Sequence, residues 1–123
     1  MSKLQELDIY VGGCDINTLT CAFIHLPAMF RAPRLQTLVY HVNPRLSDGF
    51  EKISWDTASW NLRQLHQSRE DRIAHDPLIQ VYVNRLKLDT RFGYRFDPDR
   101  VVNTLNIAFH TLKEDGTLHI YPQ

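Results

Sequence analysis

The last quarter of the chain, residues 96–121, carries its strongest structural signals. Asp97-Pro98 is a typical helix start, because an aspartate caps free N–H groups and proline suits the first helical position. The apolar residues after it follow helical spacing: Val101, Val102, Leu105, Ala108, Phe109 and Leu112. Burying each of the larger ones contributes about 1.5–3 kcal/mol before entropy is counted. The pattern predicts an amphipathic helix over residues 98–113.

A turn and a short strand are predicted to follow this helix. Gly116 suits a left-handed exit residue. Residues 117–121 then alternate, with Leu118 and Ile120 on one face of a strand. A strand of this length needs an existing sheet to pair with, so the stretch predicts a helix packed on a sheet.

Upstream, the pattern predicts strands at residues 7–11 and 35–42 and helices at 18–30 and 57–74. Residues 50–55 are assigned as a short extra strand, and Pro27 is expected to kink or end the first helix. Asp76-Pro77 repeats the start signal seen at Asp97. The residues that follow are β-branched and alternate, which favours a β-hairpin of 78–88 with 91–96 over a helix from Pro77 to Leu88.

These elements predict an α+β two-layer domain. About three helices would pack on one face of a mixed or antiparallel sheet of four to five strands. At 123 residues the whole chain, 1–123, is expected to form a single domain with a core large enough to need no disulfide or metal. No internal repeat is found.

Charge and composition bear on partners and location. The chain has 14 basic and 14 acidic residues, so its formal net charge is zero. Zero net charge argues against a polyanion such as nucleic acid as the main partner, and it favours self-association, so a homodimer is expected. No signal peptide and no apolar stretch near the length of a membrane span is found, so the sequence predicts a cytoplasmic protein without membrane contact.

Cys14 is the candidate catalytic residue. It follows Gly12-Gly13 at the expected junction of a strand and a helix, where a thiol has a lowered pKa and glycine N–H groups can face a substrate oxygen. His25 or His41 would serve as the base. The hypothesis is a cysteine-nucleophile hydrolase or acyl transferase, and the alternative is an ordinary tight turn.

Cys14, Cys21 and His25 are a candidate zinc site. Cys21 and His25 are four positions apart and would share a helix face, but the close ligand pair typical of zinc sites is missing. The sequence therefore predicts no metal and no cofactor.

The stretch Arg91–Phe96 is a candidate for single-stranded nucleic-acid binding. Aromatic residues alternate there with arginines, and such residues stack bases and hold phosphates. On a strand, however, the arginines would point away from the aromatic face. The favoured interpretation is that the aromatic residues are buried in the core and the arginines face solvent.

Large aromatic residues are more numerous than a core of this size needs, which raises a binding cavity between helices and sheet as a hypothesis. The candidate binding residues are Tyr40, His41, Trp55, Trp60 and His119. The alternative is a filled core with polar rings at its rim.

Taken together, the sequence predicts a non-catalytic binding or interaction module for a small apolar ligand or a protein partner. A small enzyme that uses Cys14 and nucleic-acid binding through residues 91–96 are the alternatives.

Overall fold

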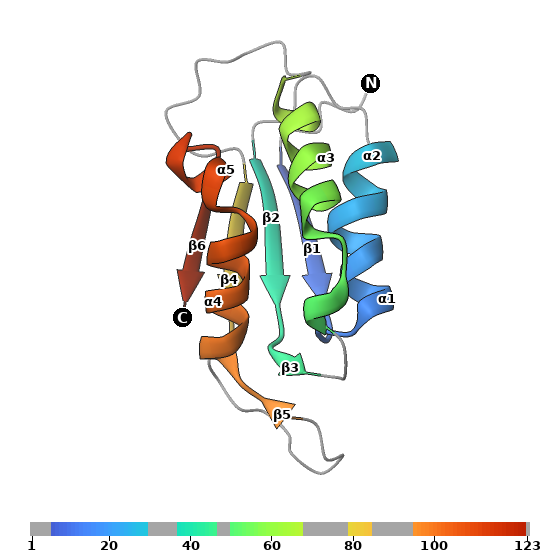
Figure 1. Cartoon of the computed structure of the whole chain (residues 1–123), viewed down its shortest axis with the longest axis vertical. Helices are drawn as coiled ribbons and strands as arrows, with labels where there is room; N and C mark the ends of the chain where they lie inside the picture. Colours follow the sequence, from blue (N-terminus) through green and yellow to red (C-terminus); the bar gives the residue numbers. More distant parts are fainter. Residues whose placement is uncertain (1–5, 30–36, 47–49, 68–78, 85–94, 123) are drawn as a thin grey trace.

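The computed structural model describes residues 6–29, 37–46, 50–67, 79–84 and 95–122. Its main sheet has four strands that all run parallel, in the order β1-β2-β4-β6 (Figure 1). The strands are β1 (Glu6–Val11), β2 (Thr37–Val42), β4 (Ile79–Val83) and β6 (Leu118–Pro122). The α+β content is confirmed, and the prediction of a mixed or antiparallel main sheet is wrong.

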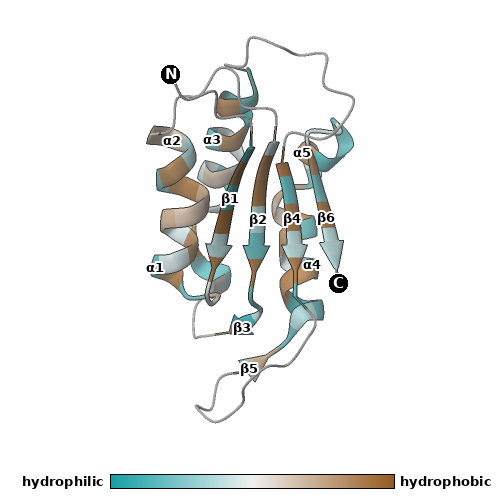
Figure 2. Ribbon diagram, turned by 180° about the vertical axis from the view of Figure 1, so that it is seen from behind, coloured by the Kyte–Doolittle hydropathy of each residue, from teal (hydrophilic) through white to brown (hydrophobic). Residues whose placement is uncertain are grey.

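The helices cover one face of this sheet. They are α1 (Ile16–Leu19), the π-helical turn η1 (Thr20–His25), α2 (Leu26–Met29), the 3-10 turn η2 (Phe50–Lys52), α3 (Trp55–Gln67), α4 (Pro98–Ala108) and α5 (His110–Glu114). In Figure 1 the long helices lie in front of the strands, and in the reverse view of Figure 2 the strands lie in front of the helices. The opposite face of the sheet is not covered by any described helix.

The direction of winding explains this one-sided arrangement. The four strands lie side by side in the same order in which they occur along the chain, so each new strand is added at the same edge of the sheet. Crossovers between parallel strands are right-handed in nearly all proteins, and right-handed crossovers that step in one direction place every helix on the same face. A sheet covered on both faces needs a reversal of direction, and the described strands have none.

Within the described residues, the predicted hairpin of residues 78–88 with 91–96 does not form. β4 is flanked by β2 on one edge and β6 on the other, so no edge is left for a hairpin partner. The described end of the second run, β5 (Arg95–Phe96), pairs instead with β3 (Arg45–Leu46) in a separate antiparallel ribbon. Residues 85–94 lie outside the described residues. The choice of strand over helix at residues 79–83 is confirmed.

The helical segment from Ile16 to Met29 shows how the structure accommodates a proline. Asp15 caps its start by accepting the N–H of Thr18 at 2.6 Å. Before Pro27 the helix widens into the π-turn, where the Leu26 N–H donates to Cys21 and not to Ala22. The next possible donor to Ala22 is Pro27, which has no N–H. The Ala22 carbonyl instead accepts the Tyr40 hydroxyl at 2.8 Å.

Other boundaries differ from the sequence prediction in detail. The expected strand at residues 50–55 is the turn η2 followed by the start of α3, and α3 begins at Trp55. The C-terminal helix is present with its Asp97 cap, which accepts the Arg100 N–H at 3.1 Å, but it breaks at Phe109 between α4 and α5. Gly116 has a φ of 75°, as expected for the exit residue.

The core lies between the helices and the inner face of the sheet. Its largest fully buried side chains include Tyr40, Phe23, Phe109, Leu62, Leu65 and Leu105. Phe23 stacks on Tyr40 with ring centroids 4.3 Å apart, and Phe109 lies 5.7 Å from Phe23. Most of the large aromatic residues noted in the sequence therefore fill the core.

Candidate binding face

The side of the main sheet that no described helix covers is called the open face below. Alternation along each strand places these residues on it: Glu6, Asp8, Tyr10, Thr37, Val39, His41, Gln80, Tyr82, His119 and Tyr121. The intervening residues, such as Leu38 and Val81, are buried against the helices. Apart from Val39, which is buried, the open face is thus polar and aromatic, whereas the inner face is apolar, with Tyr40 among its aliphatic residues.

A row of four rings crosses the open face. The strand register places its members side by side: Tyr10, His41, Tyr82 and Tyr121. Neighbouring ring centroids are 4.5, 5.8 and 4.9 Å apart in that order, and their planes lie within 10° to 19° of parallel. Because strands in a sheet are about 4.8 Å apart, upright rings on adjacent strands stack directly. We call this set the aromatic row.

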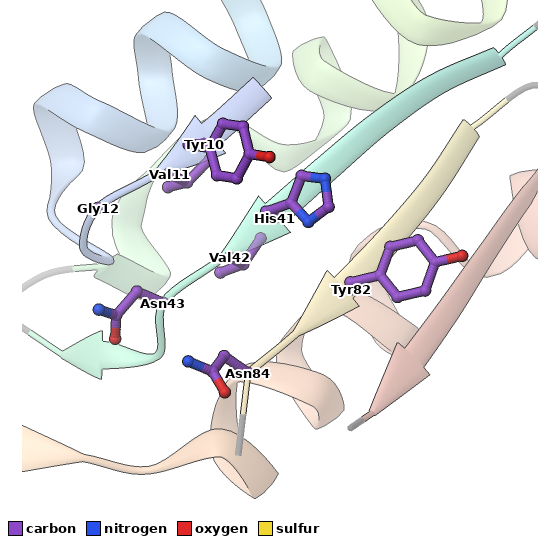
Figure 3. Close-up of a pocket in the computed structure, with 8 residues that line it drawn as sticks. All are labelled: Tyr10, Val11, Gly12, His41, Val42, Asn43, Tyr82 and Asn84. Carbon is purple, nitrogen blue, oxygen red and sulfur yellow. The ribbon is translucent and has the colours of Figure 1, made fainter. Parts of the chain in front are cut away.

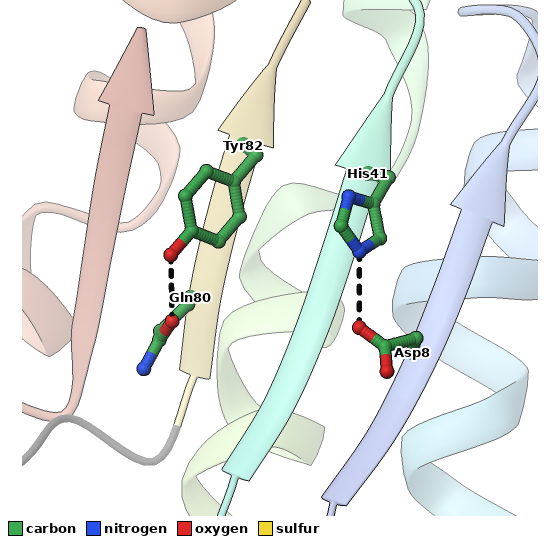
Figure 4. Close-up of polar contacts among 4 residues, drawn as sticks. All are labelled: Asp8, His41, Gln80 and Tyr82. Atoms are coloured by element: carbon green, nitrogen blue, oxygen red, sulfur yellow. Dashed lines mark hydrogen bonds and ion pairs between the residues drawn. The ribbon is translucent and has the colours of Figure 1, made fainter. Parts of the chain in front are cut away.

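Polar partners hold two rings of the aromatic row (Figure 4). His41 Nε2 lies 3.0 Å from Asp8 Oδ1, and the Tyr82 hydroxyl donates to Gln80 Oε1 at 3.0 Å. An ionised carboxylate only accepts, so His41 Nε2 carries the donated proton. Both partners precede their ring by two positions in register, so both rings lean toward the amino ends of the strands.

The charge of the open face is acidic. Glu6 and Asp8 contribute carboxylates, and His41 and His119 contribute imidazole rings. Among the described residues of this face there is no lysine or arginine. A partner of complementary charge therefore brings cations.

The aromatic row follows from a pattern that the sequence prediction missed. Each strand carries an apolar residue, a variable one, an apolar one and then Tyr or His, at residues 7–11, 38–42, 79–83 and 118–122. The register aligns these four segments position by position. The conclusion that the chain holds no internal repeat overlooked this short pattern, which was visible in the sequence.

The five predicted binding residues do not lie together. Tyr40 is fully buried in the core, and Trp55 packs on Phe23 and Phe109 there. Trp60 is 62% exposed on α3, on the helix side. His41 and His119 lie on the open face, where His41 is in the aromatic row and His119 is level with Gln80. The structure therefore does not bring these residues into one cavity, and of the five it places only His41 in the aromatic row.

Cys14 lacks the surroundings of a nucleophile. Its side chain is 1% exposed, and its Sγ donates to the Asn43 carbonyl at 3.5 Å. Burial, with a smaller effect of the Asp15 charge, raises the pKa of the thiol to about 12. His25 is exposed on η1. The buried thiol is protonated at neutral pH, which favours the structural interpretation of Cys14.

The other candidate sites find no support in the described part of the chain. Among those residues no group of three or more His, Cys, Asp or Glu side chains is placed to hold a metal ion. Most of the stretch Arg91–Phe96 lies outside the described residues, so nucleic-acid binding there stays a prediction. No described helix is both long and apolar enough to cross a membrane.

Comparisons with known proteins identify no relative. No protein-family model matches the chain, and no curated protein or solved structure matches it either. The open face and its aromatic row are therefore interpreted from their own geometry.

Proposed function

We propose that the protein is a non-catalytic interaction module that binds a basic protein partner on its open face. The aromatic row on an uncovered parallel sheet carries this proposal. Parallel sheets are almost always covered on both faces. A parallel sheet that has tyrosines on a face without a described helix over it is a surface suited to a second covering layer.

The residue types of the row support a protein interface. Tyrosine is enriched at interfaces and among the residues that carry most of the binding energy. Tyr10 is 77% exposed at the edge of the sheet. Its ring stacks on His41 on one side, which leaves the other ring face for a partner.

The row is also held in place before any partner arrives. Stacking fixes each ring against its neighbours, while Asp8 and Gln80 anchor His41 and Tyr82. Ordering a mobile side chain on binding costs about 0.5–1.5 kcal/mol. A row that is already ordered avoids most of that cost.

The charge of the face selects the partner chemistry. Asp8 and Glu6 favour arginine or lysine, and arginine also stacks on tyrosine rings. A second copy docked face to face would place the carboxylates of the two copies near one another. No lysine or arginine among the described residues of this face would pair with them. A basic partner therefore fits better than the homodimer expected from net charge.

Selection of short random peptides on the immobilised protein tests this proposal. We expect the selected peptides to be enriched in arginine, and their addition to shift backbone amide resonances of β1, β2, β4 and β6. Asp8→Asn should weaken their binding, because it removes a carboxylate while keeping the side-chain shape.

Two outcomes would overturn the proposal. Selected peptides that lack basic residues, or that shift only the resonances of α3 and α4, would place binding elsewhere. A concentration-dependent dimer that blocks the open face, seen by light scattering, would make the second copy the occupant.

A further inference from the structure

A pocket of about 470 Å³ opens on the open face beside the aromatic row, at the carboxyl ends of β1, β2 and β4 (Figure 3). The rings of Tyr10, His41 and Tyr82 form one wall. Gly12, Asn43 and Asn84 line the other side. We call this pocket the trough.

The strand register explains why the trough exists. Gly12, Asn43 and Asn84 each follow a ring of the aromatic row by two positions, and backbone hydrogen bonds continue the pairing there. The Asn43 N–H donates to Val11 at 2.9 Å, and the Asn84 N–H donates to Val42 at 3.0 Å. Small residues thus follow tall ones on three adjacent strands, and the rings of His41 and Tyr82 lean away from them.

The trough is polar but uncharged. No charged residue is among its described lining. An asparagine amide offers both donors and acceptors, as a peptide group does. The Asn43 backbone is fixed at both ends, because its N–H is bound as above and its carbonyl accepts the Arg45 N–H at 2.9 Å.

We infer that the trough binds an extended segment of the protein partner, with the Asn43 side chain hydrogen-bonding to a peptide group of that segment. This inference rests on the proposed function and names the form in which the partner docks. Three strands about 4.8 Å apart give the trough a span of about 10 Å, the length of about three extended residues. Its volume is within the range of about 300–1,000 Å³ that is typical of ligand pockets.

Two parts of the open face then bind different parts of the partner segment. The trough recognises peptide groups and is indifferent to charge. The carboxylates of Asp8 and Glu6 lie on the amino-terminal side of the aromatic row and bind the basic side chains. The segment therefore lies along the row, with its basic side chains reaching across it.

Gly12 provides the sharpest test. A Cβ added at Gly12 meets no atom within 4 Å, so alanine fits there without a clash, and we expect a larger side chain to extend into the trough that Gly12 lines. We expect peptides selected on the wild-type protein to bind Gly12→Ala more weakly and Gly12→Leu about tenfold more weakly or worse. Gly13→Ala is the matched control, because its added Cβ meets only the Arg45 carbonyl, at an ordinary 3.8 Å, and Gly13 does not line the trough.

Backbone chemistry of the probe gives the second readout. Replacing single peptide N–H groups of a selected peptide by N-methyl should weaken binding most at the position that hydrogen-bonds to the Asn43 side chain. Asn43→Ala should abolish that position dependence.

The outcomes separate this inference from the proposed function. Loss of binding in Gly12→Leu with position-dependent N-methyl effects supports the trough. Peptides that bind Gly12→Leu as tightly as wild type but lose binding in Tyr82→Ala overturn the trough and leave the open face as the binding surface. Peptides insensitive to both changes, or failure to select any peptide, overturn both.

Discussion

The ring of Tyr10 lies 4.5 Å from the ring of His41 and within 10° of parallel to it. Tyr10 is on the edge strand β1, whereas His41 is on the central strand β2 and is anchored by Asp8. The stacking contact therefore holds the exposed ring of Tyr10, at the edge of the sheet, against a ring on a central strand. The same contact repeats across β4 and β6, so the four strands share one continuous surface feature.

The position of a ring in the row should decide its contribution to stability. Tyr82 stacks on two neighbours and Tyr10 on one. Aromatic pairs contribute about 0.5–1.5 kcal/mol each, so Tyr82→Ala should cost about 1–3 kcal/mol and Tyr10→Ala about 0.5–1.5 kcal/mol. Urea unfolding measures both, and Tyr82→Phe controls for the loss of the hydroxyl. A larger loss in Tyr10→Ala than in Tyr82→Ala would contradict the stacked row.

The Tyr40 hydroxyl should stabilise the folded protein, because Pro27 leaves the Ala22 carbonyl without a hydrogen-bond donor from the helix. Tyr40→Phe buries that carbonyl unsatisfied and should cost about 1–3 kcal/mol. Pro27→Ala restores an N–H and allows the turn to return to α-helix, in which Leu26 bonds to Ala22. A double-mutant cycle should therefore show a smaller cost of Tyr40→Phe in the Pro27→Ala background. Equal costs in both backgrounds would disconnect the proline from this hydrogen bond.

The two cysteines should differ sharply in reactivity. Cys21 is exposed, whereas Cys14 is buried and protonated. Iodoacetamide at neutral pH should label Cys21 in the folded protein, and Cys14 only after unfolding, as located by mass spectrometry. Faster labelling of Cys14 than of Cys21 in the folded state would revive the cysteine-nucleophile hypothesis.

Cys14 should also make stability depend on alkaline pH. Its pKa is raised from 9.0 to about 12 in the folded state, so between these values the folded protein holds a proton that the unfolded chain has released. The contribution is complete below pH 9 and is lost as pH rises toward 12, at about 1.4 kcal/mol per pH unit. The free energy of unfolding of wild type should thus fall more steeply above pH 9 than that of Cys14→Ala. Parallel curves for the two proteins would contradict this account of Cys14.

Local features of the fold were readable from the sequence, because they depend on neighbours in the chain. The cap at Asp97, the exit at Gly116 and the strand at residues 79–83 are all present. The π-turn before Pro27 was expected only as a kink or an early end. Its form depends on Tyr40, which lies 18 residues away from Ala22 and supplies the missing donor.

The direction of the strands was not readable in the same way. Asp8, Gln80 and His119 alternate with apolar residues, which is typical of antiparallel sheets with one solvated face. Here parallel strands show that pattern because the described helices of the crossovers all lie on one side of the sheet (Figure 1, Figure 2). The aromatic row depends on register between distant strands, so it becomes visible only when the four segments are aligned.

The central claim is that the open face, and not the helix side, binds the partner. The most direct measurement is the calorimetric affinity of one selected basic peptide for wild type, Tyr82→Ala, Trp60→Ala and Ile107→Ala. Ile107 is 79% exposed on α4 and serves as the control on the helix side. We expect Tyr82→Ala to weaken binding about tenfold or more, as for a central interface residue, and the two helix-side variants to match wild type. Wild-type affinity in Tyr82→Ala together with weaker binding in Trp60→Ala would contradict the claim.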